Sequence, residues 1–147
     1  MSATASLPRP RLLARPFHRP LRALAAAALV GALATDIAYA LTADFIWVDA
    51  SDWLIPVGVV FGLLALIVGL IEHFARRHWL RPALPSVLFD LIAWLLAIAD
   101  LLVHTRDGWT SVMPWGLTLS TLVVVMLFVS EWSQRAAPAP VVVEGGA

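Results

Sequence analysis

Four long stretches of apolar residues decide what this chain can fold into. They cover residues 21–43, 53–75, 84–103 and 112–132 of a chain of 147 residues. A helix that crosses a bilayer needs about 20 consecutive, mostly apolar residues, and each stretch has that length. None shows the alternation of polar and apolar residues that strands of a membrane barrel would need. We therefore expect an all-α integral membrane protein, a bundle of four transmembrane helices.

The composition points to the same class of protein. Hydrophobic residues make up 61% of the chain and charged residues only 14%, and the mean hydropathy is +0.85. A soluble domain is about half apolar and about a quarter charged, and a chain this short cannot hide such an excess in a soluble core. The formal net charge of zero argues against nucleic-acid binding. The expected partner is the lipid bilayer.

The prolines separate the spans from the two tails. Residues 1–20 form an Arg/Pro-rich tail, and residues 133–147 form a Pro/Ala/Val-rich tail that we expect to be disordered. The four-helix transmembrane domain covers residues 21–132 between them. Pro56 and Pro114 are predicted in the first turns of the second and fourth helices, where a missing N–H is tolerated.

The arginines predict the orientation of the chain. All ten basic residues are arginine, and most lie on the same side of the predicted spans: Arg9, Arg11, Arg15, Arg19 and Arg22 at the first span, and Arg76, Arg77 and Arg81 between the second and third. The loop after the first span instead contains Asp44, Asp49 and Asp52. By the positive-inside rule, both termini and the middle loop are cytoplasmic.

A cleaved signal peptide is the alternative interpretation of the first span. The arginines, the alanine-rich run and the triplet Ala38-Tyr39-Ala40 match its three regions. The long basic flank and Asp36, close to the cleavage site, favour a retained helix. Cleavage would leave three spans.

Acidic residues inside the predicted spans indicate which helix faces are buried. Asp90, Ala93, Ala97, Asp100 and His104 fall within an arc of about 80° on the third helix. An aspartate in hydrocarbon costs a few kcal/mol, so this stripe should face the bundle or a wet crevice.

Depth groups these polar residues into two expected clusters. Counting about 1.5 Å of rise per residue gives an outer cluster of Asp36, Tyr39, Asp100 and His104. An inner cluster would contain Glu72, His73 and Asp90, with Arg76 as a further candidate. Both are candidates for a proton or ion site, and the structural alternative is that the acids form helix-to-helix hydrogen bonds.

Small residues at four-residue spacing predict close helix contacts. Such faces occur on the second, first and fourth spans: Gly58 and Gly62 with Ala65 and Gly69; Ala27, Gly31 and Thr35; and Gly116 with Ser120.

Other chemistry is weakly indicated. No phosphate-binding loop, nucleophile elbow or pair of catalytic carboxylates is recognisable, so no catalytic residue is predicted. The spacing of His73 and His78 does not match a helical zinc pair, and no metal site is predicted. Arg106, Asp107 and Trp109 form a polar outer loop that could bind a ligand or simply turn the chain.

Three segments resemble a known family. They are residues 103–114 (VHTRDGWTSVMP), residues 16–20 (PFHRP) ahead of a span with Asp36 and Tyr39, and residues 69–73 (GLIEH). Together they resemble the bacterial four-span membrane proteins grouped as domain of unknown function 2231, over roughly residues 15–132. The resemblance implies four helices and a multi-pass location in the bacterial inner (plasma) membrane. It implies no established reaction. Many members carry a histidine early in the third span, where this chain reads Leu84-Pro85-Ser86.

Three roles follow from these observations. The first is a non-enzymatic structural or accessory protein, associating with a second copy or with another membrane protein. The second is proton- or ion-coupled transport through the intramembrane aspartates. The third is a redox subunit holding haem near His18, His73 or His78, which are placed at the inner boundary. No cofactor is predicted under the first role.

Overall fold

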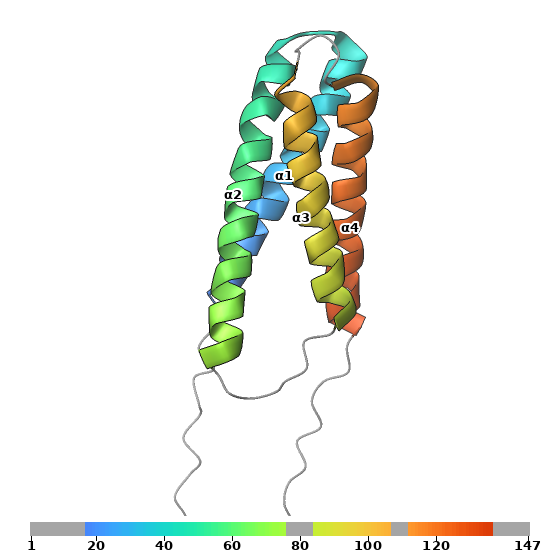
Figure 1. Cartoon of the computed structure of the whole chain (residues 1–147). Helices are drawn as coiled ribbons and strands as arrows, with labels where there is room; N and C mark the ends of the chain where they lie inside the picture. Colours follow the sequence, from blue (N-terminus) through green and yellow to red (C-terminus); the bar gives the residue numbers. More distant parts are fainter. Residues whose placement is uncertain (1–16, 76–83, 107–111, 137–147) are drawn as a thin grey trace, which may run out of the picture.

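The computed structural model describes the backbone of residues 17–75, 84–106 and 112–136, and the side chains within them except those of residues 73–75 and 84–86 (Figure 1). Its elements are α1 (His18–Thr42), α2 (Ile46–Ala75), α3 (Leu84–His104), a short kinked segment η1 (Val112–Gly116) and α4 (Leu117–Ala136). All four α-helical regions are long and apolar enough to cross a membrane. The prediction of an all-α four-span protein is therefore confirmed.

The helices run up and down, so that the start of α1 and the end of α4 lie at the same end of the bundle (Figure 1). We call this the terminal end, and we call the opposite end, where residues 43–45 join α1 to α2, the hairpin end. Helix α1 packs most extensively against α2, and α3 packs against α4. Helices α2 and α3 diverge toward the terminal end (Figure 1).

The connection between α1 and α2 is much shorter than the sequence predicted. Helix α1 ends at Ala43, which adopts a left-handed conformation (φ 55°) and donates its N–H to the carbonyl of Tyr39 at 2.8 Å. The Asp44 carboxylate then accepts the N–H of Ile46 at 3.1 Å and caps α2. The span was predicted to begin at residue 53, where the run free of charges begins. Charge marks where the apolar stretch ends, whereas the helix itself begins at its cap.

The two prolines also differ from their predicted positions. Because α2 begins at Ile46, Pro56 lies inside the helix and not in its first turn. Pro114 lies in η1, ahead of the regular helix that begins at Leu117. Met113 is extended (φ −115°, ψ 129°), because a residue before proline is disfavoured in the helical region.

Glycines on α2 allow α1 to approach closely, as the small-residue spacing predicted. A methyl group added at Gly58 would lie 2.6 Å from Cγ of Leu29 and 3.4 Å from the main-chain oxygen of Ala25. Gly62 leaves room for Trp94 of α3, whose indole N–H donates to the carbonyl of Val59 at 3.3 Å. This face of α2 is therefore shared between α1 and α3.

The small-residue face predicted on α1 is not the one that is buried most deeply. Ala27 is exposed, and Gly31 is half-buried against Leu54 of α2. The buried stripe of α1 instead consists of Ala25, Ala28, Leu29, Ala32 and Asp36. Successive residues on a helix are rotated by about 100° from one another, so the face that contains Asp36 and the face that contains Ala27 cannot both point inward. Burial of the Asp36 side chain decides which face of α1 is buried.

Large apolar side chains cover the outside of the bundle. Exposed examples occur on all four helices and include Ile37, Leu70, Leu95 and Phe128. On a soluble protein such a surface would drive aggregation. Here the apolar exterior makes contact with the lipid bilayer.

We predict that Gly58→Ala destabilises the bundle. The new methyl group must displace the buried Leu29 side chain, which should lower the free energy of unfolding by about 1–3 kcal/mol. The matched control is Gly69→Ala on the same helix, where the added carbon would meet His18 at an ordinary 3.7 Å. Unfolding midpoints in mixed micelles with increasing SDS measure both. An equal response of the two variants would contradict the close α1–α2 contact.

Candidate functional site

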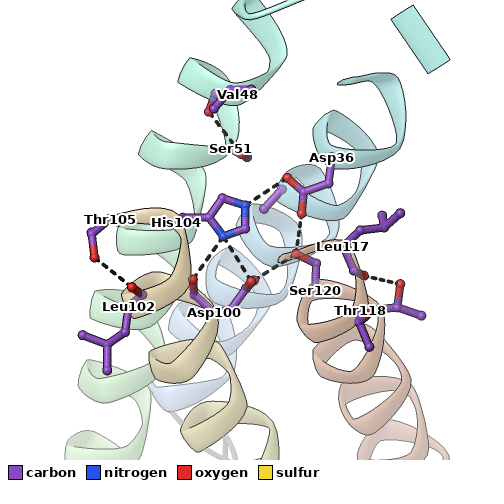
Figure 2. Close-up of polar contacts among 12 residues, drawn as sticks. Asp36, Val48, Ser51, Asp100, Leu102, His104, Thr105, Leu117, Thr118 and Ser120 are labelled. Atoms are coloured by element: carbon purple, nitrogen blue, oxygen red, sulfur yellow. Dashed lines mark hydrogen bonds and ion pairs between the residues drawn. The ribbon is translucent and has the colours of Figure 1, made fainter. Parts of the chain in front are cut away.

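Four polar side chains are buried together near the hairpin end (Figure 2). Asp36 comes from α1, Asp100 and His104 from α3, and Ser120 from α4. Their exposed fractions are 0%, 1%, 4% and 2%, in that order. We call these four residues the buried cluster.

The hydroxyl of Ser120 is the centre of the buried cluster. Its Oγ lies 2.5 Å from Oδ2 of Asp36 and 2.9 Å from Oδ2 of Asp100. The ring of His104 lies on the other side of both acids (Figure 2). Nε2 of His104 is 3.3 Å from Oδ1 of Asp36, and Nδ1 is 3.0 Å from the main-chain oxygen of Asp100 and 3.2 Å from its Oδ1. Three helices are thus joined by one set of polar contacts.

Local sequence explains why these side chains meet. Asp100 and His104 are four residues apart, so they lie on one face of α3. Ala93 and Ala97 continue the same face and are fully buried, as the predicted stripe required. Ser120 lies in the first turn of α4, just after η1. The sequence had indicated Ser120 only as a small residue beside Gly116, and its role as a hydrogen-bond donor was missed.

The electrostatics of the buried cluster are unusual because two acids share one histidine and no arginine. Helix α2 contributes further negative charge. Asp52 is exposed but close enough for its charge to interact with His104 and Asp36, and Asp49 lies near Asp52. Within the buried cluster itself, His104 is the one side chain that can carry a positive charge.

A second polar group lies at the terminal end and contains an arginine. Nη2 of Arg22 is 3.0 Å from both Ser130 Oγ and Asp90 Oδ1, and 3.8 Å from Glu131 Oε2. Ser130 also donates to Asp90 at 2.6 Å. We call Arg22, Asp90, Ser130 and Glu131 the arginine cluster. The positive-inside rule accounts for Arg22 as part of the cytoplasmic flank, so its partners were not predicted.

The predicted inner cluster does not form as one group. Asp90 belongs to the arginine cluster, whereas Glu72 pairs with His18 at 2.7 Å and accepts the main-chain N–H of Phe17 at 2.6 Å. Glu72 thereby caps the start of α1, which has no side-chain cap of its own. The divergence of α2 from α3 at this end accounts for the separation (Figure 1). The side chain of His73, and residues Arg76 and His78, lie outside the described part.

The remaining candidates are placed as follows. The ring of Tyr39, near the end of α1, packs against the ring of Phe45 in the α1–α2 connection, at a centroid distance of 5.9 Å. Arg106 is exposed after the end of α3. Asp107 and Trp109 lie outside the described residues.

The described histidine side chains make polar contacts within the bundle. In the part of the chain that the structure describes, no three His, Cys, Asp or Glu side chains are grouped to hold a metal ion. Both ring nitrogens of His104 are engaged by the two aspartates. One ring nitrogen of His18 is engaged by Glu72. A haem iron needs an unshared imidazole nitrogen, and His104 does not offer one.

An apolar layer separates the two polar clusters. Asp90 and Asp100 are ten residues apart on α3, a rise of about 15 Å. Leu29, Ala97 and Val123 form a buried hydrophobic cluster, against which Leu96 and Leu127 pack. No polar side chain in the described residues is recorded as bridging this layer.

The fold and its two polar clusters define a multi-pass α-helical membrane protein. Residues 14–136 match the model of the family described as "Predicted membrane protein (DUF2231)". The chain belongs to this family, and the predicted resemblance is confirmed. No curated protein and no solved structure matches the chain.

We predict that Ser120→Ala destabilises the protein. Removal of the hydroxyl leaves two buried carboxyl groups without their common partner, at a cost of about 1–3 kcal/mol in the free energy of unfolding. Ser133→Ala is the control on the same helix, because the hydrogen bond of that hydroxyl among the described residues is to the carbonyl of Val129 in its own helix. SDS unfolding midpoints measure both variants. A Ser120→Ala midpoint equal to that of Ser133→Ala would contradict the bridging role.

Proposed function

We propose that this protein is a structural or accessory component of the bacterial inner membrane rather than an enzyme. The observation that carries the proposal is that the buried polar side chains of α1, α3 and α4 bond to one another. Side chains that fasten helices together satisfy each other in this way, because lipid offers no other partners. A catalytic site would instead need polar groups facing a space where a substrate could bind.

The apolar layer favours a structural role over transport. A proton path across the membrane needs polar side chains or water at short intervals. Between the buried cluster and the arginine cluster, about 15 Å of the bundle interior is lined by Ala97, Leu29 and Val123. Transport through these residues would require a different arrangement of the helices.

The proposed orientation places the terminal end in the cytoplasm. Arg19, Arg22 and Arg135 lie at this end of the described bundle, whereas Asp44, Asp49 and Asp52 lie at or near the hairpin end. Arginine is enriched on the cytoplasmic side of membrane proteins. We infer that both termini are cytoplasmic.

An accessory role implies a protein partner in the membrane. Gly58 and Gly62 pack within the bundle and so are not free for this purpose. Small residues still exposed on α1, such as Ala23, Ala27 and Ala34, provide a surface through which we propose association with a second copy or another membrane protein.

The orientation predicts which ends a membrane-impermeant thiol reagent can reach. The chain lacks cysteine, so single cysteines can be introduced at the exposed positions Thr105→Cys, at the hairpin end, and Ala136→Cys, at the terminal end. In intact spheroplasts we expect a charged maleimide to label Thr105→Cys only. Ala136→Cys should react only after permeabilisation. The reverse pattern would place the termini outside.

The structural role predicts no protein-dependent proton flux. Proteoliposomes containing the wild-type chain should acidify no faster than empty liposomes under an imposed potential, with a protonophore as the positive control. Asp90→Asn should lower the SDS unfolding midpoint because it removes the ion pair with Arg22, and neither Asp90→Asn nor Asp100→Asn should change this flux. A wild-type flux that disappears in a folded aspartate variant would support transport and overturn the proposal.

A further inference from the structure

We propose that the buried cluster binds two protons beyond those of its ordinary ionised form and is electrically neutral as a result. The ordinary form has both aspartates ionised and His104 carrying one ring proton, with a total charge of minus two. The ligand is the proton itself, held between named atoms of α1, α3 and α4. This inference does not depend on whether the protein is structural or transports ions.

The first bound proton follows from Ser120. Its Oγ is within hydrogen-bond distance of Oδ2 of Asp36 and Oδ2 of Asp100. A hydroxyl has one hydrogen, so it can donate to only one of these oxygens. An ionised carboxylate only accepts, so the second contact is a hydrogen bond only if that carboxyl is protonated and donates to Oγ. One of the two acids therefore carries a proton.

The second bound proton follows from His104. Nδ1 lies 3.0 Å from the main-chain oxygen of Asp100, which can only accept, so Nδ1 carries the ordinary ring proton. Nε2 faces Oδ1 of Asp36 at 3.3 Å. That contact also requires a proton, either on Nε2 or on the carboxyl oxygen. In both cases it is additional to the ordinary form.

The surroundings favour these protons over a metal ion. All four side chains are at most 4% exposed, and an uncompensated charge in such a place costs several kcal/mol. The charge of Asp52 on α2 interacts with His104 and Asp36, and Asp49 lies near Asp52; both are acids, and Asp52 attracts protons further. Oδ2 of each aspartate lies in direct hydrogen-bond contact with Ser120, and no metal-holding group is found among the described residues.

The arginine cluster shows the alternative solution within the same bundle. Ser130 and Asp90 repeat the pairing of Ser120 and Asp100, ten residues away along each helix. There, α1 contributes the permanent positive charge of Arg22, which forms an ion pair with Asp90. At the buried cluster α1 contributes a second acid, Asp36. The bound protons must therefore supply the positive charge that balances the two acids.

The experiment counts protons released when the intact chain unfolds. At about pH 8 an unfolded aspartate is ionised and an unfolded histidine is neutral, so SDS unfolding in weakly buffered micelles should release about two protons from the buried cluster. Asp100→Asn provides an amide that can donate to Ser120 and needs no proton, so release should fall by about one. Asp44→Asn, which replaces an exposed acid outside the buried cluster by an amide whose oxygen can still accept the N–H of Ile46, should release the same number as the wild type.

The wild-type chain alone gives a second measurement, which does not require any variant to fold. Because the folded state holds two more protons than the unfolded state, stability must fall as pH rises. Above about pH 7.5 the folding equilibrium constant should fall about 100-fold per pH unit while both protons remain bound, and about tenfold in Asp100→Asn. Release of less than one proton on wild-type unfolding, or a stability independent of pH between about 7.5 and 8.5, would overturn the proposal. An Asp100→Asn release equal to that of Asp44→Asn would do the same.

Discussion

The hydroxyl of Ser120 joins three helices at a depth where lipid surrounds the bundle and separating the helices would expose polar groups to hydrocarbon. It lies between the carboxyl groups of Asp36 and Asp100 and so joins α1, α3 and α4 at one point. In hydrocarbon no water is available to replace a lost polar contact. The three helices must therefore stay together at this depth, and their rotations follow from the direction in which these side chains point.

A second level of polar contact fixes the register of the bundle. Asp90 and Ser130 lie ten residues from Asp100 and Ser120 on antiparallel helices, so the two pairs form at matching heights. Helix α1 meets both levels, with Arg22 at one and Asp36 at the other. Because α1 must satisfy both, its alanine stripe from Ala25 to Ala32 faces inward and Ala27 faces outward.

Sequence reasoning reached the number of spans and the buried stripe of α3, because both follow from the polarity of neighbouring residues on one helix. It did not separate Glu72 from Asp90, since equal depth does not specify which helices remain close at that depth. Nor did it find the partners of Arg22, because an arginine near a membrane boundary has a sufficient explanation in the positive-inside rule. The early start of α2 was not predicted, because Asp49 and Asp52 interrupt the apolar run whereas the helix begins at its Asp44 cap.

The sequence by itself determined that four helices cross a bilayer and that acidic side chains lie within them. The apolar stretches are long enough to span the bilayer, and in hydrocarbon a helix satisfies the hydrogen bonds of its own backbone. Only the tertiary structure decided which acids meet. Asp36 and Asp100 are 64 positions apart in the printed chain, and their common partner Ser120 comes from a third helix. Such a meeting depends on helix rotation and crossing, which are set by packing between helices and not by the pattern along any one of them.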